Sequence, residues 1–196
     1  MAVTLINFFE VRADADEAFI AGWERARDFL AAREGFGATA LHRALREDAR
    51  FRFVNVAAID APDAWRAAVG DPAFPGREMP FKGRPALYET VHDDGSADGD
   101  DGVVLINPFE VPADDDDDEA FLAAWKAARD VLAANRGYLG TRLHRSLGPA
   151  DFRFVNVARW SSPLMFSRGV SRPDFQQAAA AVNRPAHPAL YQVVRR

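Results

Sequence analysis

The sequence predicts an α+β protein made of two copies of one β-α-β-β-α-β unit. Residues 51–57, FRFVNVA, return in the same order at 152–158, which indicates an internal repeat. Apolar and polar side chains alternate in several short stretches, as they do along strands. The stretches between them carry apolar residues at the spacing of an amphipathic helix.

The first strand of each unit is predicted at residues 3–11 and 103–111, which are rich in β-branched and aromatic residues. Asn7 and Asn107 interrupt these apolar strands at equivalent positions. Pro108 lies inside the second copy. Because proline has no backbone N–H, this strand should run along a sheet edge or have its amide position facing away from a neighbour there.

A helix is predicted at about residues 17–33, with acidic residues at its start and Gly35 just beyond its end. Its apolar stripe recurs with the same spacing in the second unit, as expected for a helix that packs on a sheet. The two stripes are Phe19, Trp23, Ala26 and Leu30, and Phe121, Trp125, Ala128 and Leu132. We interpret the acidic run at 114–118 as a solvated helix start, because adjacent carboxylates repel one another and have no fixed metal-binding geometry.

The remaining elements also occur in pairs. Second strands are predicted at 39–45 and 141–147, and each forms a hairpin with its copy of the repeated strand. The next elements are helices around 62–69 and 163–170, a further short helix at 175–182 and closing strands at 86–91 and 189–194. This order of elements is the split β-α-β pattern of the ferredoxin-like fold.

The stretch between the copies is polar, acidic and rich in glycine, which is typical of a linker. We therefore predict a first domain at residues 1–92, a linker at 93–102 and a second domain at 103–196. Domains of this size have modest cores, so the two are expected to share an interface, like a dimer on one chain.

Composition excludes several kinds of partner and site. The formal net charge of -5 argues against a nucleic-acid partner, which requires a basic face. The chain has no cysteine, so disulfides and thiolate metal sites are excluded. No apolar run is long enough to cross a bilayer, and strand residues begin close to Met1. We predict a cytoplasmic protein with no membrane partner and no bound metal.

The motifs of these segments together resemble those of a known family. They are a strand with an inward asparagine, a helix with Phe-x-x-x-Trp, a Gly-Phe or Gly-Tyr turn, and strands with Leu-His-Arg, Phe-Val-Asn-Val and Ala-Leu-Tyr. This set is similar to the antibiotic biosynthesis monooxygenase domain family and covers nearly all of both halves. The resemblance implies that the two repeats close into an intrachain pseudo-dimeric α+β barrel. The family includes anthrone-type oxygenases, quinol monooxygenases and haem-degrading monooxygenases, so it leaves the reaction open.

The resemblance implies a cofactor-independent monooxygenase that oxidises an electron-rich anthrone, phenol or quinol-like substrate with O2. In such a site polar donors stabilise the substrate anion and apolar walls exclude water. The catalytic candidates, by position, are Asn7, His42, Asn55, Asn107, His144 and Asn156. The substrate-binding candidates are Trp23, Arg43, Trp65, Trp125, Arg145 and Trp160. Among these, the histidines would act as general bases and the strand arginines would pair with an anionic oxygen.

Each candidate also has a structural interpretation. The helix tryptophans could belong to the core, the asparagines could satisfy backbone groups, and the arginines could pair with the acidic surface. For the whole protein, the alternative is a non-catalytic small-molecule binding or interaction protein of the same fold. Haem binding or degradation fits less well, because the second helical segment of each unit contains no histidine to hold the iron. A homodimer of the whole chain is a further alternative.

Overall fold

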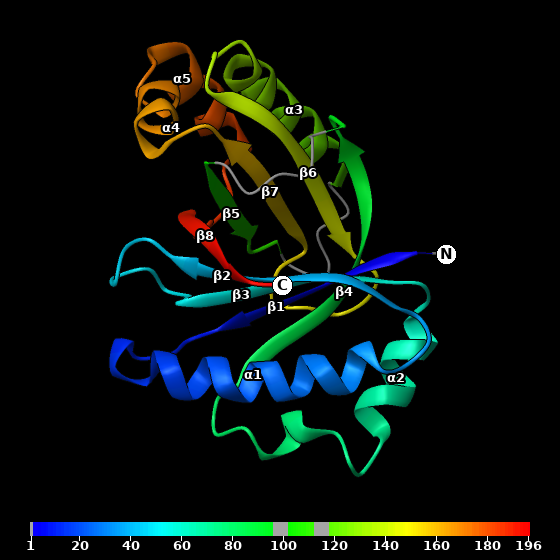
Figure 1. Ribbon diagram of the computed structural model, residues 1–196. Helices are drawn as coiled ribbons and strands as arrows, with labels where there is room; N and C mark the ends of the chain where they lie inside the picture. Colours follow the sequence, from blue (N-terminus) through cyan, green and yellow to red (C-terminus); the bar gives the residue numbers. More distant parts are fainter. Residues whose placement is uncertain (1, 96–101, 112–117) are drawn as a thin grey trace. The chain divides into compact units, whose positions relative to one another are not determined.

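The computed structural model describes residues 2–95, 102–111 and 118–196 (Figure 1). The elements of the first repeat are β1 (Val3–Phe9), η1 (Ala13–Ala15), α1 (Asp16–Ala31), β2 (Phe36–Ala44), β3 (Phe53–Ile59), α2 (Pro62–Gly70), η2 (Pro75–Glu78) and β4 (Gly83–Asp93). Those of the second repeat are β5 (Val103–Phe109), α3 (Asp118–Ala133), β6 (Tyr138–Ser146), β7 (Phe154–Trp160), α4 (Pro163–Val170), α5 (Pro173–Val182) and β8 (Ala189–Arg195). The predicted order of elements is therefore confirmed in both repeats.

Local sequence explains why the two repeats differ after their second helix. Both α2 and α4 begin with proline, whose missing N–H costs nothing in the first turn. In the second repeat α5 then continues as a helix until Asn183, which adopts the left-handed conformation that ends it. In the first repeat Pro75 and Pro80 prevent a long helix, and only the short 3-10 segment η2 forms.

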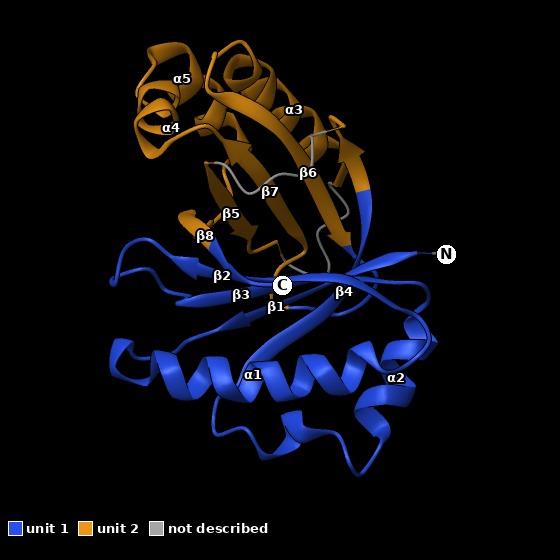
Figure 2. Cartoon of the chain, in the orientation of Figure 1, with its two compact units in different colours: residues 1–90, 146–150, 193–196 blue, residues 91–145, 151–192 orange. Residues whose placement is uncertain are grey.

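The contacts of the chain divide it into two compact units (Figure 2). Unit 1 contains residues 1–90, 146–150 and 193–196, and unit 2 contains residues 91–145 and 151–192. The final residues of β4 thus belong to unit 2, whereas the final residues of β8 belong to unit 1.

Each unit is built on antiparallel strands with the same pairing. In unit 1, β1 lies between β3 and β4, and β2 follows β3. In unit 2, β5 lies between β7 and β8, and β6 follows β7. The strand order β1-β3-β2-β8-β5-β7-β6-β4 is that of a closed barrel. Two ferredoxin-like repeats therefore form the predicted α+β barrel.

Stacked aromatic rings fasten the long helix of each repeat to its sheet. In unit 1 the ring of Phe19 lies 4.4 Å from that of Phe53, centroid to centroid, and both side chains are fully buried. The equivalent pair in unit 2, Phe121 and Phe154, lies at 4.2 Å. Stacking at these distances adds to the free energy that the rings gain from burial. The apolar stripes predicted for the two helices are thus confirmed as their sheet-facing sides.

Two details of the predicted strands are corrected. The repeated strands begin at Phe53 and Phe154, two residues later than predicted, and Phe51 packs its ring on Phe8 from outside the strand. Of the two alternatives predicted for Pro108, the sheet edge is wrong, because β5 pairs with strands on both sides, and the position without a ladder partner applies on the β8 side. The continuous register of β5 with β8 ends at Ile106, so the missing N–H of Pro108 interrupts no bond of that ladder.

Parts of two predicted segments lie outside the described residues. These are 96–101 of the linker and 114–117 of the acidic run. Within the described ranges, no helix is long and apolar enough to cross a membrane.

Candidate functional site

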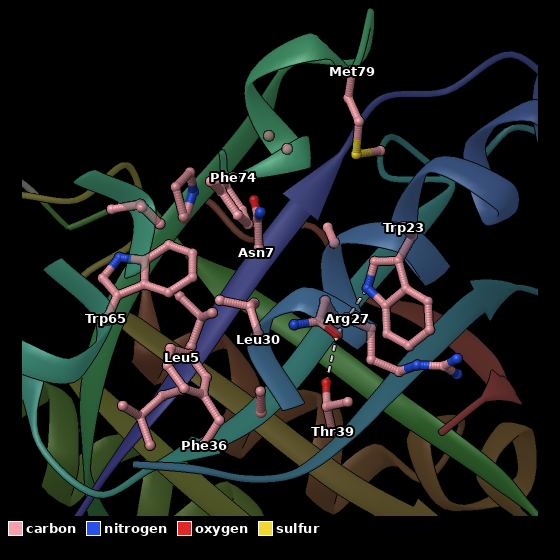
Figure 3. A pocket seen from close by; sticks show the side chains of 18 of the residues that line it. Leu5, Asn7, Trp23, Arg27, Leu30, Phe36, Thr39, Trp65, Phe74 and Met79 are labelled. Carbon is pink, nitrogen blue, oxygen red and sulfur yellow. Dashed lines mark hydrogen bonds between the residues drawn. The ribbon is translucent and has the colours of Figure 1, made fainter. Parts of the chain in front are cut away.

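Unit 1 contains a cavity of about 410 Å³ between its sheet, α1, α2 and the η2 segment. In Figure 3, Trp65 and Trp23 stand on opposite sides of this space, and Asn7 extends toward it from β1. The wall is mainly aromatic and aliphatic; its larger apolar members are Leu5, Phe9, Trp23, Leu30, Phe36, Ile59, Trp65, Val69, Phe74, Met79 and Phe81. A mostly apolar cavity with a few polar groups is typical of a small-molecule site.

The central polar group of the cavity is Asn55 on β3. Its Oδ1 accepts hydrogen bonds from Trp23 Nε1 at 3.1 Å and from Thr39 Oγ1 at 2.9 Å. An indole nitrogen can only donate, so these bonds fix which end of the amide is the oxygen. Asn55 Nδ2 has no hydrogen bond within the described part of the chain. The amide can therefore offer a ligand its N–H donors but not its oxygen.

A second amide, that of Asn7, lies opposite Asn55 in the register between β1 and β3. Its Oδ1 is buried, and among the described residues it has no hydrogen-bond partner. A Cβ atom placed on Gly83 would lie 2.6 Å from this oxygen and 2.8 Å from Asn7 Nδ2. The amide of Asn7 can therefore occupy this position only because Gly83 has no side chain. A buried amide without a partner is costly, which favours a role in binding.

Two arginines complete the polar part of the wall. Arg27 on α1 donates to Asp28 Oδ1 at 2.9 Å and to the Arg196 carbonyl at 2.7 Å, and its guanidinium lies 5.4 Å from the centre of the Trp23 ring. Arg77 in η2 donates to the Val69 carbonyl at 2.8 Å. No carboxylate within the described ranges forms an ion pair with Arg77. Arg77 acts on nearby Asp71 through its charge and without a direct ion pair, so its remaining N–H groups are available to a ligand.

The other unit 1 candidates lie outside this cavity. His42 pairs with Val54, and because side chains alternate along a strand, it lies on the sheet face opposite to Asn55. His42 Nδ1 contacts the Val54 carbonyl at 3.2 Å, and burial lowers the pKa of the ring to about 4. Arg43 forms an ion pair with Asp16 at 3.6 Å. The structure thus brings together Asn7, Trp23, Asn55 and Trp65, but it separates them from His42 and Arg43.

The equivalent asparagines of unit 2 have different surroundings. Asn156 Oδ1 accepts from Thr141 Oγ1 at 2.5 Å. Asn107 Oδ1 is buried without a partner among the described residues, as in Asn7. Trp125 lies edge-on to His92, with ring centres 5.1 Å apart.

Unit 2 also carries larger side chains where unit 1 has its cavity wall. Trp160 takes the register position of Ile59 and is fully buried between Tyr138 and Phe166. Its Nε1 has no partner in the described ranges. Trp160 is predicted to bind substrate; in the structure its side chain packs in the hydrophobic core of unit 2.

The last two unit 2 candidates resemble their unit 1 copies. His144 is buried, and burial followed by the charge of Arg142 lowers its pKa to about 4. Arg145 contacts Asp118 at 3.4 Å. Arg43 and Arg145 therefore both pair with an acidic residue, as the structural interpretation of the strand arginines expects.

Sequence reasoning missed a polar cluster around Asp94 in unit 2. Asp94 accepts hydrogen bonds from Tyr138 and Arg129, and His92 Nε2 lies 2.7 Å from its Oδ1. Burial opposes ionisation of Asp94, but the bonds from Tyr138, Arg129 and His92 outweigh it and keep the pKa of Asp94 below its ordinary value. The residue lies in a stretch whose composition is that of a linker, so no local pattern identifies it.

The cavity residues that sequence reasoning missed are Arg27, Thr39, Arg77 and Gly83. Thr39 carried a signal, since it recurs as Thr141 in the second copy. Arg77 and Gly83 have no such signal, because the second copy has Ala178 and Ala186 at these places.

Comparison with known proteins agrees with this architecture. Residues 102–181 match the family described as antibiotic biosynthesis monooxygenase. A solved anthrone oxidase-like protein has a TM-score of 0.78 at 17% identity, over 99% of this chain and 91% of that one. A monooxygenase-like protein from Listeria innocua has a TM-score of 0.57 at 12% identity, over 99% and 95%. A heme-degrading enzyme from Listeria monocytogenes has a TM-score of 0.54 at 14% identity, over 96% and 98%. At these identities the structures share a fold; no curated protein matches the sequence.

Proposed function

We propose that the chain is a tandem member of the antibiotic biosynthesis monooxygenase family, whose model matches residues 102–181. We propose further that the unit 1 cavity oxidises an electron-rich aromatic compound with O2 and without a bound cofactor. The substrate class is an anthrone, phenol or hydroquinone. The observation that carries this proposal is the pair of amides Asn7 and Asn55. They lie side by side on the adjacent strands β1 and β3, and both line the same mainly aromatic cavity. Both have hydrogen-bonding capacity that the described residues leave unused.

The chemistry requires an anion that is oxidised easily. For an anthrone, loss of a ring proton gives a carbanion that is also a phenolate-type oxyanion. This anion transfers one electron to O2, and the resulting radical and superoxide combine through a new C–O bond. The peroxide then loses the second proton from the same carbon, the O–O bond breaks and hydroxide leaves. The net reaction converts a CH2 group and O2 into a carbonyl group and water.

The residues of unit 1 would assist this sequence by stabilising the oxyanion. Asn55 is held by Trp23 and Thr39, so its N–H donors need no reorganisation when charge develops on the substrate. Trp65 and Phe36 supply flat apolar walls against which a planar ring can stack. Such walls also keep water from the anion and strengthen its interactions with the amide donors.

The described lining of this cavity is a poor fit for haem. It contains no histidine, tyrosine or cysteine, which are the usual ligands of haem iron besides methionine. Its methionine, Met79, packs on α1, where its Cε lies 3.1 Å from the Cβ position of Gly22. This supports a reaction that depends on the substrate and O2 alone.

The test is oxygen consumption by metal-free protein with a panel of anthrones and hydroquinones. Asn7→Ala should lower the rate above the spontaneous reaction roughly 100-fold, as expected for loss of one oxyanion donor. Asn107→Ala makes the same change in unit 2 and should leave the rate unchanged. Thermal unfolding of both variants checks that they fold.

Two results would contradict this assignment. If only Asn107→Ala lost activity, unit 2 would be the working half. If no substrate were consumed above the spontaneous rate, a non-catalytic binding protein would be the better description.

A further inference from the structure

The charged groups of the unit 1 cavity are all of one sign. The elements that surround it are β1 to β4, α1, α2 and η2, and the ionisable side chains they contribute to its described lining are those of Arg27 and Arg77. Neither a carboxylate nor a histidine belongs to that lining. Since arginine stays protonated at any pH that proteins tolerate, these residues offer no group that could take a proton from a ligand.

Two carboxylates close to the cavity arginines do not change this conclusion. Asp28 lies beside Arg27 and accepts its hydrogen bonds at 2.9 and 2.7 Å. Asp71 lies near Arg77, and a backbone hydrogen bond from Ala73 followed by the bond from Arg33 lowers its pKa, so it is ionised at neutral pH. Both carboxylates therefore already hold positive partners. Neither of them lines the cavity.

The N–H donors of the two asparagines also favour a ligand that accepts hydrogen bonds. Asn55 can only donate to a ligand, because Trp23 and Thr39 already occupy its oxygen. Asn7 offers two further N–H donors, and its buried Oδ1, which has no partner among the described residues, can accept one hydrogen bond from a neighbouring group of the ligand. A hydroxyl group that kept its proton would use these donors less well than an oxyanion, because hydrogen bonds to a charged acceptor are about twice as strong.

From these contacts we infer that the cavity binds its ligand as an anion, with the proton lost to the solvent and not to a side chain. The ligand class is an acidic phenol or enol carried on a planar ring system, recognised as ArO⁻ after ArOH has released H⁺ to water. This inference rests on the proposed function, because it describes the same cavity. It adds that the acidity of the substrate, and not a protein base, sets the pH dependence of binding.

The second repeat supplies an internal comparison for this inference. The position equivalent to Arg77 is Ala178, which belongs to helix α5. The second repeat therefore has no cation at the position of Arg77. Arg77 is exposed, so salt screens its charge and its contribution should be smaller than that of the buried amide donors.

The experiment uses 4-nitro-1-naphthol, whose neutral and anionic forms absorb differently, and its methyl ether, which cannot ionise. The nitro group makes the probe electron-poor, so its binding can be measured even if the protein oxidises nothing. We expect the pKa of the bound probe to fall by at least one unit relative to the free probe, because the anion binds at least tenfold more tightly than the neutral form. The methyl ether should bind at least tenfold more weakly than the anion.

Arg77→Gln should weaken binding of the anion about threefold and leave that of the methyl ether unchanged. Arg66→Gln is the matched control, since Arg66 is 71% exposed on α2 and pairs with Asp63. A bound probe whose pKa is unchanged or raised would overturn the inference, as would equal binding of the ether or no binding of either compound. Equal affinity of Arg77→Gln and the unaltered protein for the anion would overturn the part assigned to Arg77. Oxygen uptake with electron-rich substrates tests the proposed function separately.

Discussion

Replacement of Gly83 by alanine should weaken ligand binding in unit 1 more than it destabilises the fold. The new Cβ would lie 2.6 Å from Asn7 Oδ1 and 2.8 Å from Phe9 Cε1, whereas ordinary contacts begin at 3.4 Å. The amide oxygen must therefore withdraw by the difference between 3.4 and 2.6 Å, about 0.8 Å. The amide ends a flexible side chain and can turn away, but the Phe9 ring is buried and has less freedom.

The size of the effect follows from that displacement. A hydrogen bond of roughly 2.9 Å between Asn7 and a ligand would lengthen beyond the range in which such bonds form. Its loss costs about 1 to 1.5 kcal/mol, so the affinity for an oxyanion should fall about tenfold. The free energy of unfolding should fall by about 1 kcal/mol, at the low end of the cost of overpacking.

Binding is measured by titration with 4-nitro-1-naphthol, and stability by urea denaturation. Gly148→Ala is the matched control, because a Cβ at Gly148 would meet no atom within 4 Å. If Gly83→Ala bound the probe as tightly as Gly148→Ala did, the reasoning that Gly83 positions Asn7 would be refuted. The second repeat already carries alanine at this place, Ala186, so the change does not conflict with the fold itself.

Three further predictions concern stability and the asparagine network. Phe19→Ala should lower the free energy of unfolding by about 3 to 5 kcal/mol in urea, because the ring is fully buried against three others; a loss below about 1 kcal/mol would contradict the packing described. Trp23→Phe should leave Asn55 with one donor instead of two, lowering stability by about 1 kcal/mol and slowing oxygen uptake; unchanged uptake would show that the orientation of Asn55 is unimportant. Burial lowers the pKa of His42 and of His144 to about 4 in the folded state, so the unfolded chain binds more protons between about pH 6.5 and 4. Stability should therefore be constant above this range and fall by up to about 3 kcal/mol per histidine as the pH drops through it; pH-dependent denaturation checks this, and replacing both histidines by leucine should flatten the curve.

The order of strands and helices could be predicted because the repeat presents each pattern twice. The stripe with Trp23 and the strand with Asn55 are local patterns with a fixed period, and their partnership in the structure follows from packing the helix on the sheet. Alternation alone does not say which face of a strand meets the helix. The sequence alone therefore predicts that His42 and Leu41 point to opposite faces of the sheet. It does not say which of the two faces the cavity, and the structure shows that His42 lies on the other face.

The missed residues depend on contacts between segments that are distant in the sequence. Gly83 matters through the amide of Asn7, and Arg77 matters because η2 folds back along α1 and the end of α2. Neither has a spacing rule that could reveal it. Asp94 illustrates the reverse case, since acidic and glycine-rich composition indicated a solvated linker, whereas its side chain is 9% exposed and bonded to Tyr138.

The assignment of the strand ends has an evolutionary consequence. Val194, from the second repeat, packs against the aromatic core of unit 1. If the two repeats were separate identical chains, each would need the end of its last strand supplied by a second molecule. Joining them in one chain raises the local concentration of that strand end. In a dimer of identical chains every substitution appears twice. In a single chain the two copies can differ, as Gly83 and Arg77 differ from Ala186 and Ala178, so a residue that serves binding in one half need not be repeated in the other.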